Sequence, residues 1–224
     1  MKKCINCGAK ISGNFCPNCG MEVPDFYEKA NRAGAGKKSS QVIIAIVSVI
    51  VVMAIAAGIA VCLTAYKQMI ENQYADNLDS FMVEVTSGAV EAETQGNLVA
   101  AVWYDAIWGN TSEEDTYKYV AGAADFDEAL ENLYLDEDFQ AKSATLNDKR
   151  NAAYELMLEL QEPPDKYKAC YDLALELYSQ YSMLIDLVTC PTGSYNSYSE
   201  KFEELDTQVA ELCGKLNTMI PVVY

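Results

Sequence analysis

Four cysteines near the start of the chain have the residue type and spacing of a metal site. They form two C-x-x-C pairs, Cys4 with Cys7 and Cys16 with Cys19, and a glycine follows each pair. Each pair can place two thiolates on one side of a tetrahedral ion. Four protein ligands leave no coordination position for water, so we expect one structural zinc ion per chain. The alternative, a redox dithiol pair, normally lies in a larger α/β domain.

Histidine is absent from all 224 residues. This excludes His-based acid and base chemistry, Ser-His-Asp and Cys-His arrangements, and metal sites that need imidazole. We therefore expect no enzymatic activity, and no small-molecule substrate is evident. A weaker alternative is an envelope hydrolase that uses paired carboxylates, because such an enzyme needs no histidine.

Two other groups of residues have a functional and a structural interpretation. Trp103, Tyr104 and Trp108 could form an exposed aromatic platform, but their helical spacing beside Val99 and Val102 favours a place in the core. The acidic runs 113–115 and 136–138 could bind calcium, but they lack the residue alternation of a calcium loop. Each run precedes a predicted helix, where negative charge stabilises the helix N-terminus, so we favour helix capping.

The cysteines lie in a segment, residues 1–23, that is too small to bury a sufficient core without a metal. We expect it to form two short strands around the turn Ser12-Gly13-Asn14. The patterns Cys4-Ile5-Asn6-Cys7-Gly8 and Cys16-Pro17-Asn18-Cys19-Gly20 resemble the short zinc ribbon found at the cytoplasmic N-terminus of many bacterial membrane proteins. The resemblance covers about a tenth of the chain. It implies zinc bound by Cys4, Cys7, Cys16 and Cys19, a single transmembrane helix, and an outer domain whose ligand it does not identify.

A basic linker and an apolar segment follow the cysteines. Residues 24–41 are polar, contain glycine and include Lys37 and Lys38, which predicts a flexible linker. Residues 42–66 contain no charged side chain and are long enough for a transmembrane helix. Because basic residues gather before this segment, the positive-inside rule predicts a cytoplasmic N-terminus and an extracytoplasmic C-terminal domain.

Charge is divided unevenly along the chain. Residues 1–41 carry a net charge of +4 and residues 67–224 a net charge of −21, which together account for the −17 of the whole chain. An acidic domain of this size repels nucleic acid, since nucleic acid is bound chiefly through Lys and Arg. We expect no nucleic-acid binding by the outer domain.

The outer domain, residues 67–224, is predicted to be an antiparallel helical bundle, so the fold class of the chain is mostly α. Apolar residues from Tyr66 to Ala92 recur every three or four positions, which predicts that the membrane helix continues as a stalk. Further helices are predicted around 114–123, from Asp125 with a capping box to Glu128, and over 138–160. Two more follow, one with the stripe Tyr167, Cys170, Ala174, Leu177, Tyr181, Leu184 and Val188, the other with Tyr198, Phe202, Leu205, Val209, Leu212, Leu216 and Met219.

Cys170 and Cys213 are expected at one height on the last two helices if the chain reverses at 190–194. A disulfide and two free thiols both remain open, with free thiols slightly favoured because helix axes normally pack too far apart for a bridge.

These features together favour a non-enzymatic, membrane-anchored sensor, adaptor or scaffold of the cell envelope, with a protein or envelope component as its partner. The alternative is a structural accessory subunit of a larger envelope complex.

Overall fold

The computed structural model describes residues 2–22 and 36–221. These divide into two compact units, Met1–Thr64 and Ala65–Tyr224. Of the predicted linker 24–41, only 36–41 belong to the described residues, as the first residues of a helix. The remainder of that prediction lies outside the part of the chain that the structure describes.

The first unit begins with two short antiparallel strands, β1 (Lys2–Lys3) and β2 (Lys10–Ile11), and an isolated bridge joins Phe15 to Glu22. Strands on the two sides of the turn at 12–14 were predicted, and this pairing is wrong. Instead, β1 and β2 pair on the two sides of Cys4 and Cys7, and the bridge pairs residues on the two sides of Cys16 and Cys19. The physical reason is that each cysteine pair reverses the chain itself, so the residues immediately before and after it lie side by side.

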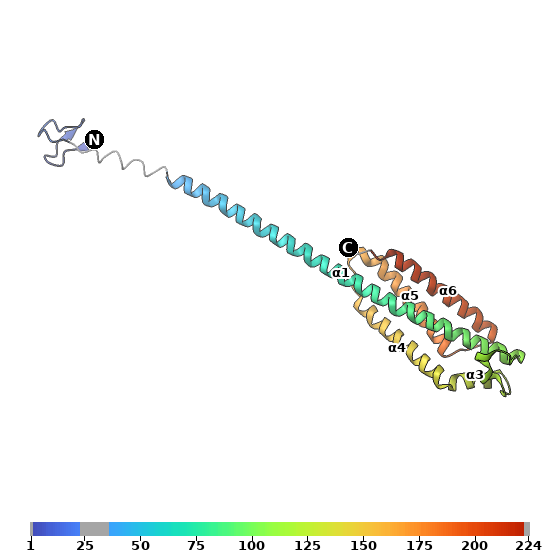
Figure 1. Cartoon of the computed structure of the whole chain (residues 1–224). Coiled ribbons are helices and arrows are strands. Elements are labelled where there is room, and N and C mark those ends of the chain that lie inside the picture. The colour runs from blue at the N-terminus through green and yellow to red at the C-terminus, as the bar shows by residue number, and fades with distance from the viewer. Residues whose placement is uncertain (1, 23–35, 222–224) are drawn as a thin grey trace. The chain divides into compact units, whose positions relative to one another are not determined.

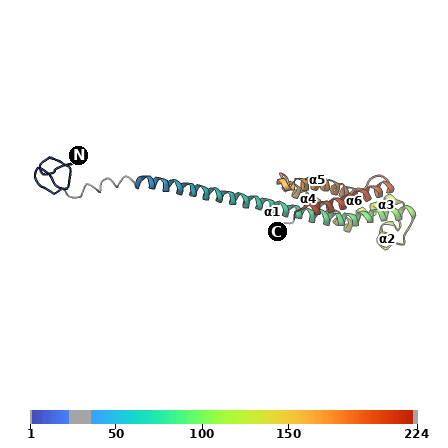
Figure 2. The same cartoon turned by 90° about the horizontal axis from the view of Figure 1, so that it is seen from above.

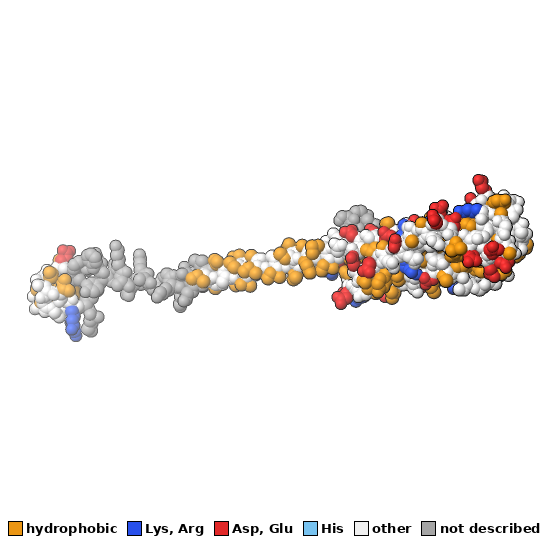
Figure 3. Space-filling view, turned by 90° about the horizontal axis from the view of Figure 1, so that it is seen from below, with side chains coloured by type: hydrophobic (Ala, Val, Ile, Leu, Met, Phe, Trp, Pro, Cys, Tyr) orange, Lys and Arg blue, Asp and Glu red, His pale blue; other side chains and the backbone are white. Residues whose placement is uncertain are grey.

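Helix α1 (Gly36–Trp108) is the longest element of the chain. Its apolar segment is long and apolar enough to span a membrane, and none of that segment is buried against other described residues. From Ile44 to Leu63 large apolar side chains are exposed all around the helix, and Figure 3 shows no charged side chain on the face of this segment in view. By length and composition, α1 is therefore the one candidate membrane helix among the described residues.

The helix continues past its apolar segment, as predicted, and from Tyr74 onward it is a core helix where an uncovered stalk was expected. Tyr66 and Ile70 are exposed, but from Tyr74 onward the predicted stripe is buried, with Leu78, Phe81, Val85 and Ala92 fully covered. The hydroxyl of Tyr74 donates a hydrogen bond to the carbonyl of Leu160, 86 residues later in the chain. The apolar period thus predicted the buried face of this part of α1, but a stripe on one helix does not tell at which residue other helices begin to cover it.

Among the described residues, six shorter elements follow α1: α2 (Glu114–Val120), α3 (Phe126–Leu135), α4 (Glu137–Glu159), the 3-10 helix η3 (Asp165–Tyr167), α5 (Lys168–Thr189) and α6 (Tyr195–Met219). Side chains cap the starts of α3, α4 and α6, whereas α2, η3 and α5 begin without a side-chain cap. Asp125 accepts a hydrogen bond from the amide of Glu128, and Ser194 and Ser197 form a capping box at the start of α6. The predicted box at Asp125 is half formed, because the Glu128 carboxylate accepts from the amide of Ala124 instead.

Helices α4, α5 and α6 lie alongside the second part of α1, as both views in Figures 1 and 2 show. The hydrogen bonds give their directions. Gln95 and Ser87 of α1 meet Ser143 and Lys149 of α4, so these two helices run antiparallel. Tyr198 of α6 donates to the carbonyl of Gly96, which places the start of α6 beside the later part of α1. Consecutive long helices of the chain thus alternate in direction, as short connections between helices require.

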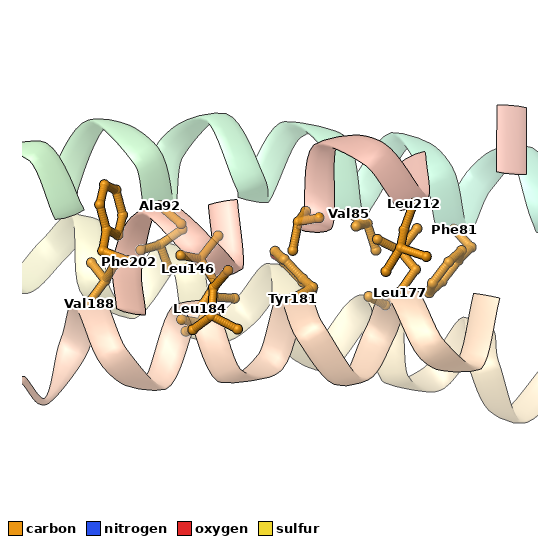
Figure 4. Packing of buried hydrophobic residues seen from close by; sticks show 14 of the residues in the cluster. Phe81, Val85, Ala92, Leu146, Leu177, Tyr181, Leu184, Val188, Phe202 and Leu212 are labelled. Carbon is orange, nitrogen blue, oxygen red and sulfur yellow. The ribbon is translucent and has the colours of Figure 1, made fainter. Parts of the chain in front are cut away.

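One hydrophobic core runs between these helices (Figure 4). Every residue of the predicted α5 stripe is buried, and so is the predicted α6 stripe up to Leu216. Met219, the last member of the α6 stripe, is exposed because α6 ends there. Two glycines of α1 let aromatic rings reach the backbone: a Cβ on Gly88 or Gly96 would collide with Tyr181 or Phe202.

Cys170 and Cys213 are both free thiols. The Cys170 thiol points to the carbonyl of Met219, at 3.5 Å, six residues beyond Cys213 along α6. The Cys213 sulfur lies 4.0 Å from the hydroxyl of Thr86 on α1. The equal-height prediction is therefore wrong. None of residues 190–194, between α5 and α6, is helical, and non-helical residues advance the chain farther than helical ones, so the equal rise assumed in the prediction does not hold across this connection.

Candidate metal centre

The two C-x-x-C segments of the first unit form equivalent backbone turns. In the first, the Cys4 amide donates to the Ala9 carbonyl and the Gly8 amide to the Cys4 carbonyl, at 2.8 and 2.9 Å. In the second, the amides of Cys16 and Gly20 make the corresponding bonds at 2.9 Å. Gly8 and Gly20 have φ of 73° and 69°, a conformation that costs glycine little and other residues more. Glycine is therefore the residue best suited to these two positions.

The turns bring all four cysteine sulfurs together. The Sγ atoms of Cys4 and Cys19 are 3.6 Å apart, as are those of Cys7 and Cys16, and all four lie within 4.8 Å of one another. These distances are far longer than the S–S bond of a disulfide, about 2 Å. The close pairs join one turn to the other, so a single ion between the turns would touch all four sulfurs. The predicted cluster of Cys4, Cys7, Cys16 and Cys19 is confirmed as a possible metal site.

The thiols of the cluster do not ionise equally. Amide N–H groups of Cys7 and Asn6 lower the pKa of Cys4. The amide of Ala9, together with the side chain of Asn18, lowers the pKa of Cys7 to about 6. The amide of Met21 also favours the Cys19 thiolate, but the neighbouring sulfurs of Cys7 and Cys4 outweigh it and raise the pKa of Cys19 to about 11.

This pattern has a simple electrostatic cause. Hydrogen-bond donors around the cluster favour thiolates, while each added negative charge opposes the next one. A bound cation removes that opposition, because coordinating thiols are deprotonated. Asn18, which lies between the second pair of cysteines, contributes a donor to this cluster that spacing alone did not reveal.

Burial around the cluster is limited. Cys4 and Cys16 are buried with Ile11, whereas Cys7 and Cys19 are exposed. Three buried side chains are a very small core for a folded unit. Coordination of a metal ion by the four sulfurs is therefore the main interaction available to stabilise the fold of residues 2–22.

The acidic runs do not form a second metal site among the described residues, where the cysteines are the one group of three or more candidate ligands that meets at metal-binding distances. Asp136 caps α4, accepting from the amide of Phe139 at 3.1 Å, and pairs with Lys118 at 2.7 Å. Those contacts hold the pKa of Asp136 below its usual range, with the Lys118 ammonium as the largest cause. Glu113 occupies the cap position of α2 without a side-chain hydrogen bond, and Glu114 and Asp115 lie in the first turn. The capping interpretation is confirmed for Asp136.

The aromatic residues of α1 divide between core and surface. Trp103 is 4% exposed, as the core interpretation predicted, but Tyr104 and Trp108 are 44% and 59% exposed. The core interpretation is wrong for these two, because Tyr104 is turned about 100° around α1 from Trp103 and Trp108 is the last residue of that helix. Their ring partner Tyr195 was missed by sequence reasoning, since it lies 87 residues beyond Trp108 and no local pattern connects them.

The chain matches no protein-family model, and no curated protein or solved structure is similar to it at a significant level.

Proposed function

We propose that this protein is a non-enzymatic adaptor or sensor of the cell envelope. It holds a structural zinc ribbon in the cytoplasm, crosses the membrane once, and presents an acidic helical domain outside. The observation that carries the proposal is the cluster of four cysteines, which leaves no ligand position open. It is supported by helix α1, whose first part is apolar and unburied and whose second part is buried in a helical core.

Zinc is the metal that fits the site best. Tetrahedral zinc at about 2.3 Å from each sulfur requires sulfurs about 3.8 Å apart, and the two close pairs are separated by 3.6 Å. Four thiolates without histidine or carboxylate are typical of structural zinc sites. The ion would tie the two turns together and supply folding free energy that the small core lacks.

The membrane topology is supported by charge and by solvation. Apolar side chains exposed around a whole helix are unfavourable in water and favourable in lipid. Basic residues precede this segment, while the unit after it is strongly acidic. A basic flank on one side and an acidic domain on the other favour a cytoplasmic N-terminus.

The first experiment measures metal in the full-length protein, purified in detergent without chelator. We expect one zinc per chain in the native protein and a large loss in Cys16→Ser. Cys190→Ser is the matched control, because it removes an exposed thiol outside the cluster. Native protein without any bound metal, or zinc retained in full by Cys16→Ser, contradicts the zinc ribbon.

The second experiment tests topology with an impermeant thiol reagent on intact cells. Cys190 is an exposed native reporter in the helical unit, and Asn31→Cys in a background with both Cys190→Ser and Cys213→Ser is the reporter on the other side of the apolar segment. We expect labelling of Cys190 and none of the introduced cysteine until the cells are opened. The opposite pattern reverses the proposed orientation.

The third experiment tests the adaptor role with a photo-crosslinking residue placed at Ile5 or at Trp108, both of which are exposed. A defined protein partner crosslinked at either position in living cells supports the adaptor role. Crosslinks to lipid alone at both positions contradict it.

A further inference from the structure

The end of α1 and the starts of α3 and α6 enclose an open cleft of about 620 Å³ in the helical unit. Its chemistry is given by six of the residues that line it: Trp103, Trp108, Asp125, Phe126, Tyr195 and Asn196. Four of these are aromatic, and they come from three segments that are distant in the sequence. The tertiary structure, and no local motif, gathers these aromatic rings.

Tyr195 stands at a steep angle to both tryptophans, while Trp103 and Phe126 are nearly parallel, with planes inclined by 23° at 6.3 Å. Trp108 and Tyr195 have ring centroids 5.8 Å apart and planes inclined by 74°, and Trp103 and Tyr195 are inclined by 71° at 6.4 Å. Tyr104 stacks on Trp108 at 4.4 Å, which supports the exposed indole and covers part of one of its faces. The result is a corner of aromatic walls, in contrast to a single flat platform.

Charge decides what such a corner attracts. Asp125 is the one charged side chain that lines the cleft among the described residues, and no lysine or arginine does. Only one of its carboxylate oxygens is used by the α3 cap, at 3.0 Å from the amide of Glu128. Asp127 and Glu128 follow in the same helix turn, and the region from residue 67 to the C-terminus carries a net charge of −21.

We infer that this aromatic corner, with Asp125 at its edge, binds the guanidinium group of an arginine on a partner protein. Aromatic faces attract organic cations, most often guanidinium, which also stacks flat on a ring while its N–H groups bind a carboxylate. An anionic ligand is disfavoured by Asp125 and by the surrounding acidic domain. A sugar stacks on one broad open face, and the broadest face here is already partly covered by Tyr104.

Charge favours a basic protein segment over a membrane surface as the source of the cation. Residues 67–224 carry a net charge of −21, so a membrane surface that contains anionic lipids is repelled by this unit. A basic segment of a second protein can reach the cleft, and the acidic domain would attract that segment from a distance.

The chain contains two tryptophans, and both line this cleft, so intrinsic tryptophan fluorescence of the full-length protein reports on it directly. The probe is the capped tripeptide acetyl-Gly-Arg-Gly-amide, titrated at constant ionic strength into protein in a detergent without ammonium groups. The comparison peptide carries citrulline in place of arginine, which keeps the shape and removes the charge. We expect a saturable change with arginine and at least tenfold weaker binding with citrulline.

Two substitutions, each of which removes one negative charge, distinguish a contact within the cleft from the overall negative charge of the helical unit. Asp125→Asn should weaken arginine binding several-fold, and Asn preserves the α3 cap because it is as good a cap as Asp. Asp136→Asn removes one charge from the cap of α4, outside the cleft, and should leave the affinity unchanged. Trp108→Leu should abolish most binding, with Trp103 still available as the reporter.

Three outcomes overturn the inference. Equal binding of the arginine and citrulline peptides removes the role of charge. Equal weakening by Asp125→Asn and Asp136→Asn assigns the binding to the overall field. Saturation by the neutral sugar diacetylchitobiose, with no response to the arginine peptide, assigns the corner to glycan. None of these results depends on zinc content or on membrane orientation, so failure here is distinguishable from failure of the proposed function.

Discussion

The phenol of Tyr181 on α5 lies directly against the backbone of Gly88 on α1. A Cβ on Gly88 would stand 1.8 Å from the Tyr181 Oη, closer than any real contact. The two helices approach at this level because one of them has no side chain there. Glycine in a helix normally lowers stability, so its presence at this position is explained by packing.

Replacing Gly88 by alanine should therefore destabilise the helical unit. Alanine gains about 1 kcal/mol of helix propensity, but forcing a fully buried tyrosine aside costs about 3 kcal/mol, the upper end of the usual cost of overpacking, so we expect a net loss of about 2 kcal/mol. Denaturant unfolding of the full-length protein in detergent measures it. The control is Gly214→Ala in α6, where a Cβ meets nothing within 4 Å and stability should rise by about 1 kcal/mol. A stabilising Gly88→Ala would show that the helices do not approach as described.

Two buried tyrosines should respond differently to loss of their hydroxyl groups. Tyr198 donates a hydrogen bond to the carbonyl of Gly96 at 3.1 Å, whereas the buried hydroxyl of Tyr181 has no partner among the described residues. We expect Tyr198→Phe to cost about 1 kcal/mol and Tyr181→Phe to be neutral or slightly stabilising, because an unpaired buried hydroxyl is itself unfavourable. The same unfolding measurement compares them. Equal losses in both variants would mean that Tyr181 has a partner after all.

The three cysteines of the helical unit should react with alkylating reagent in the order Cys190, Cys213, Cys170. Cys190 is exposed, Cys213 is half-buried and Cys170 is buried. Burial raises the pKa of both the Cys170 and the Cys213 thiols, which lowers the reactive thiolate fraction. Timed alkylation of the native protein followed by mass spectrometry gives the order. A linked Cys170–Cys213 peptide in non-reduced protein would contradict the free thiols.

Asp206 on α6 should be a carboxylate that weakens the fold at neutral pH. Burial and then the nearby charge of Glu93 raise its pKa in the folded state. The folded state thus binds this proton more tightly than the unfolded state, and stability is lost as the pH rises through the raised pKa. Asp206→Asn should gain about 0.5 kcal/mol at pH 7, and the gain should disappear below about pH 4, where the unfolded carboxyl is also protonated.

The control for this prediction is Glu203→Gln, which removes one exposed negative charge from the same helix. Unfolding curves at pH 7 and at pH 4 measure both variants. If Glu203→Gln stabilises the protein as much as Asp206→Asn, the effect belongs to the net charge of the domain and not to the burial of Asp206.

The sequence alone determined the features that depend on near neighbours in the chain. The cysteine spacing predicted the cluster, because each pair needs only one tight turn and a glycine to aim its sulfurs. The apolar segment predicted a helix able to span a membrane, and the stripe of α5 predicted its buried face residue by residue. The start of α3 followed from Asp125, whose cap acts over three residues.

Only the tertiary structure decided the features that depend on register between distant segments. Strand pairing around the cysteines, the heights of Cys170 and Cys213, and the exposure of Trp108 all depend on where one element ends relative to another. A few extended residues move a helix by several ångströms, and the hydrophobic period of each helix is unchanged by that shift. The periodic pattern therefore identifies which face of a helix is buried, and it does not determine the height of that helix beside its neighbours. The aromatic corner of Trp103, Trp108 and Tyr195 exists because packing brings the end of α1 beside the start of α6.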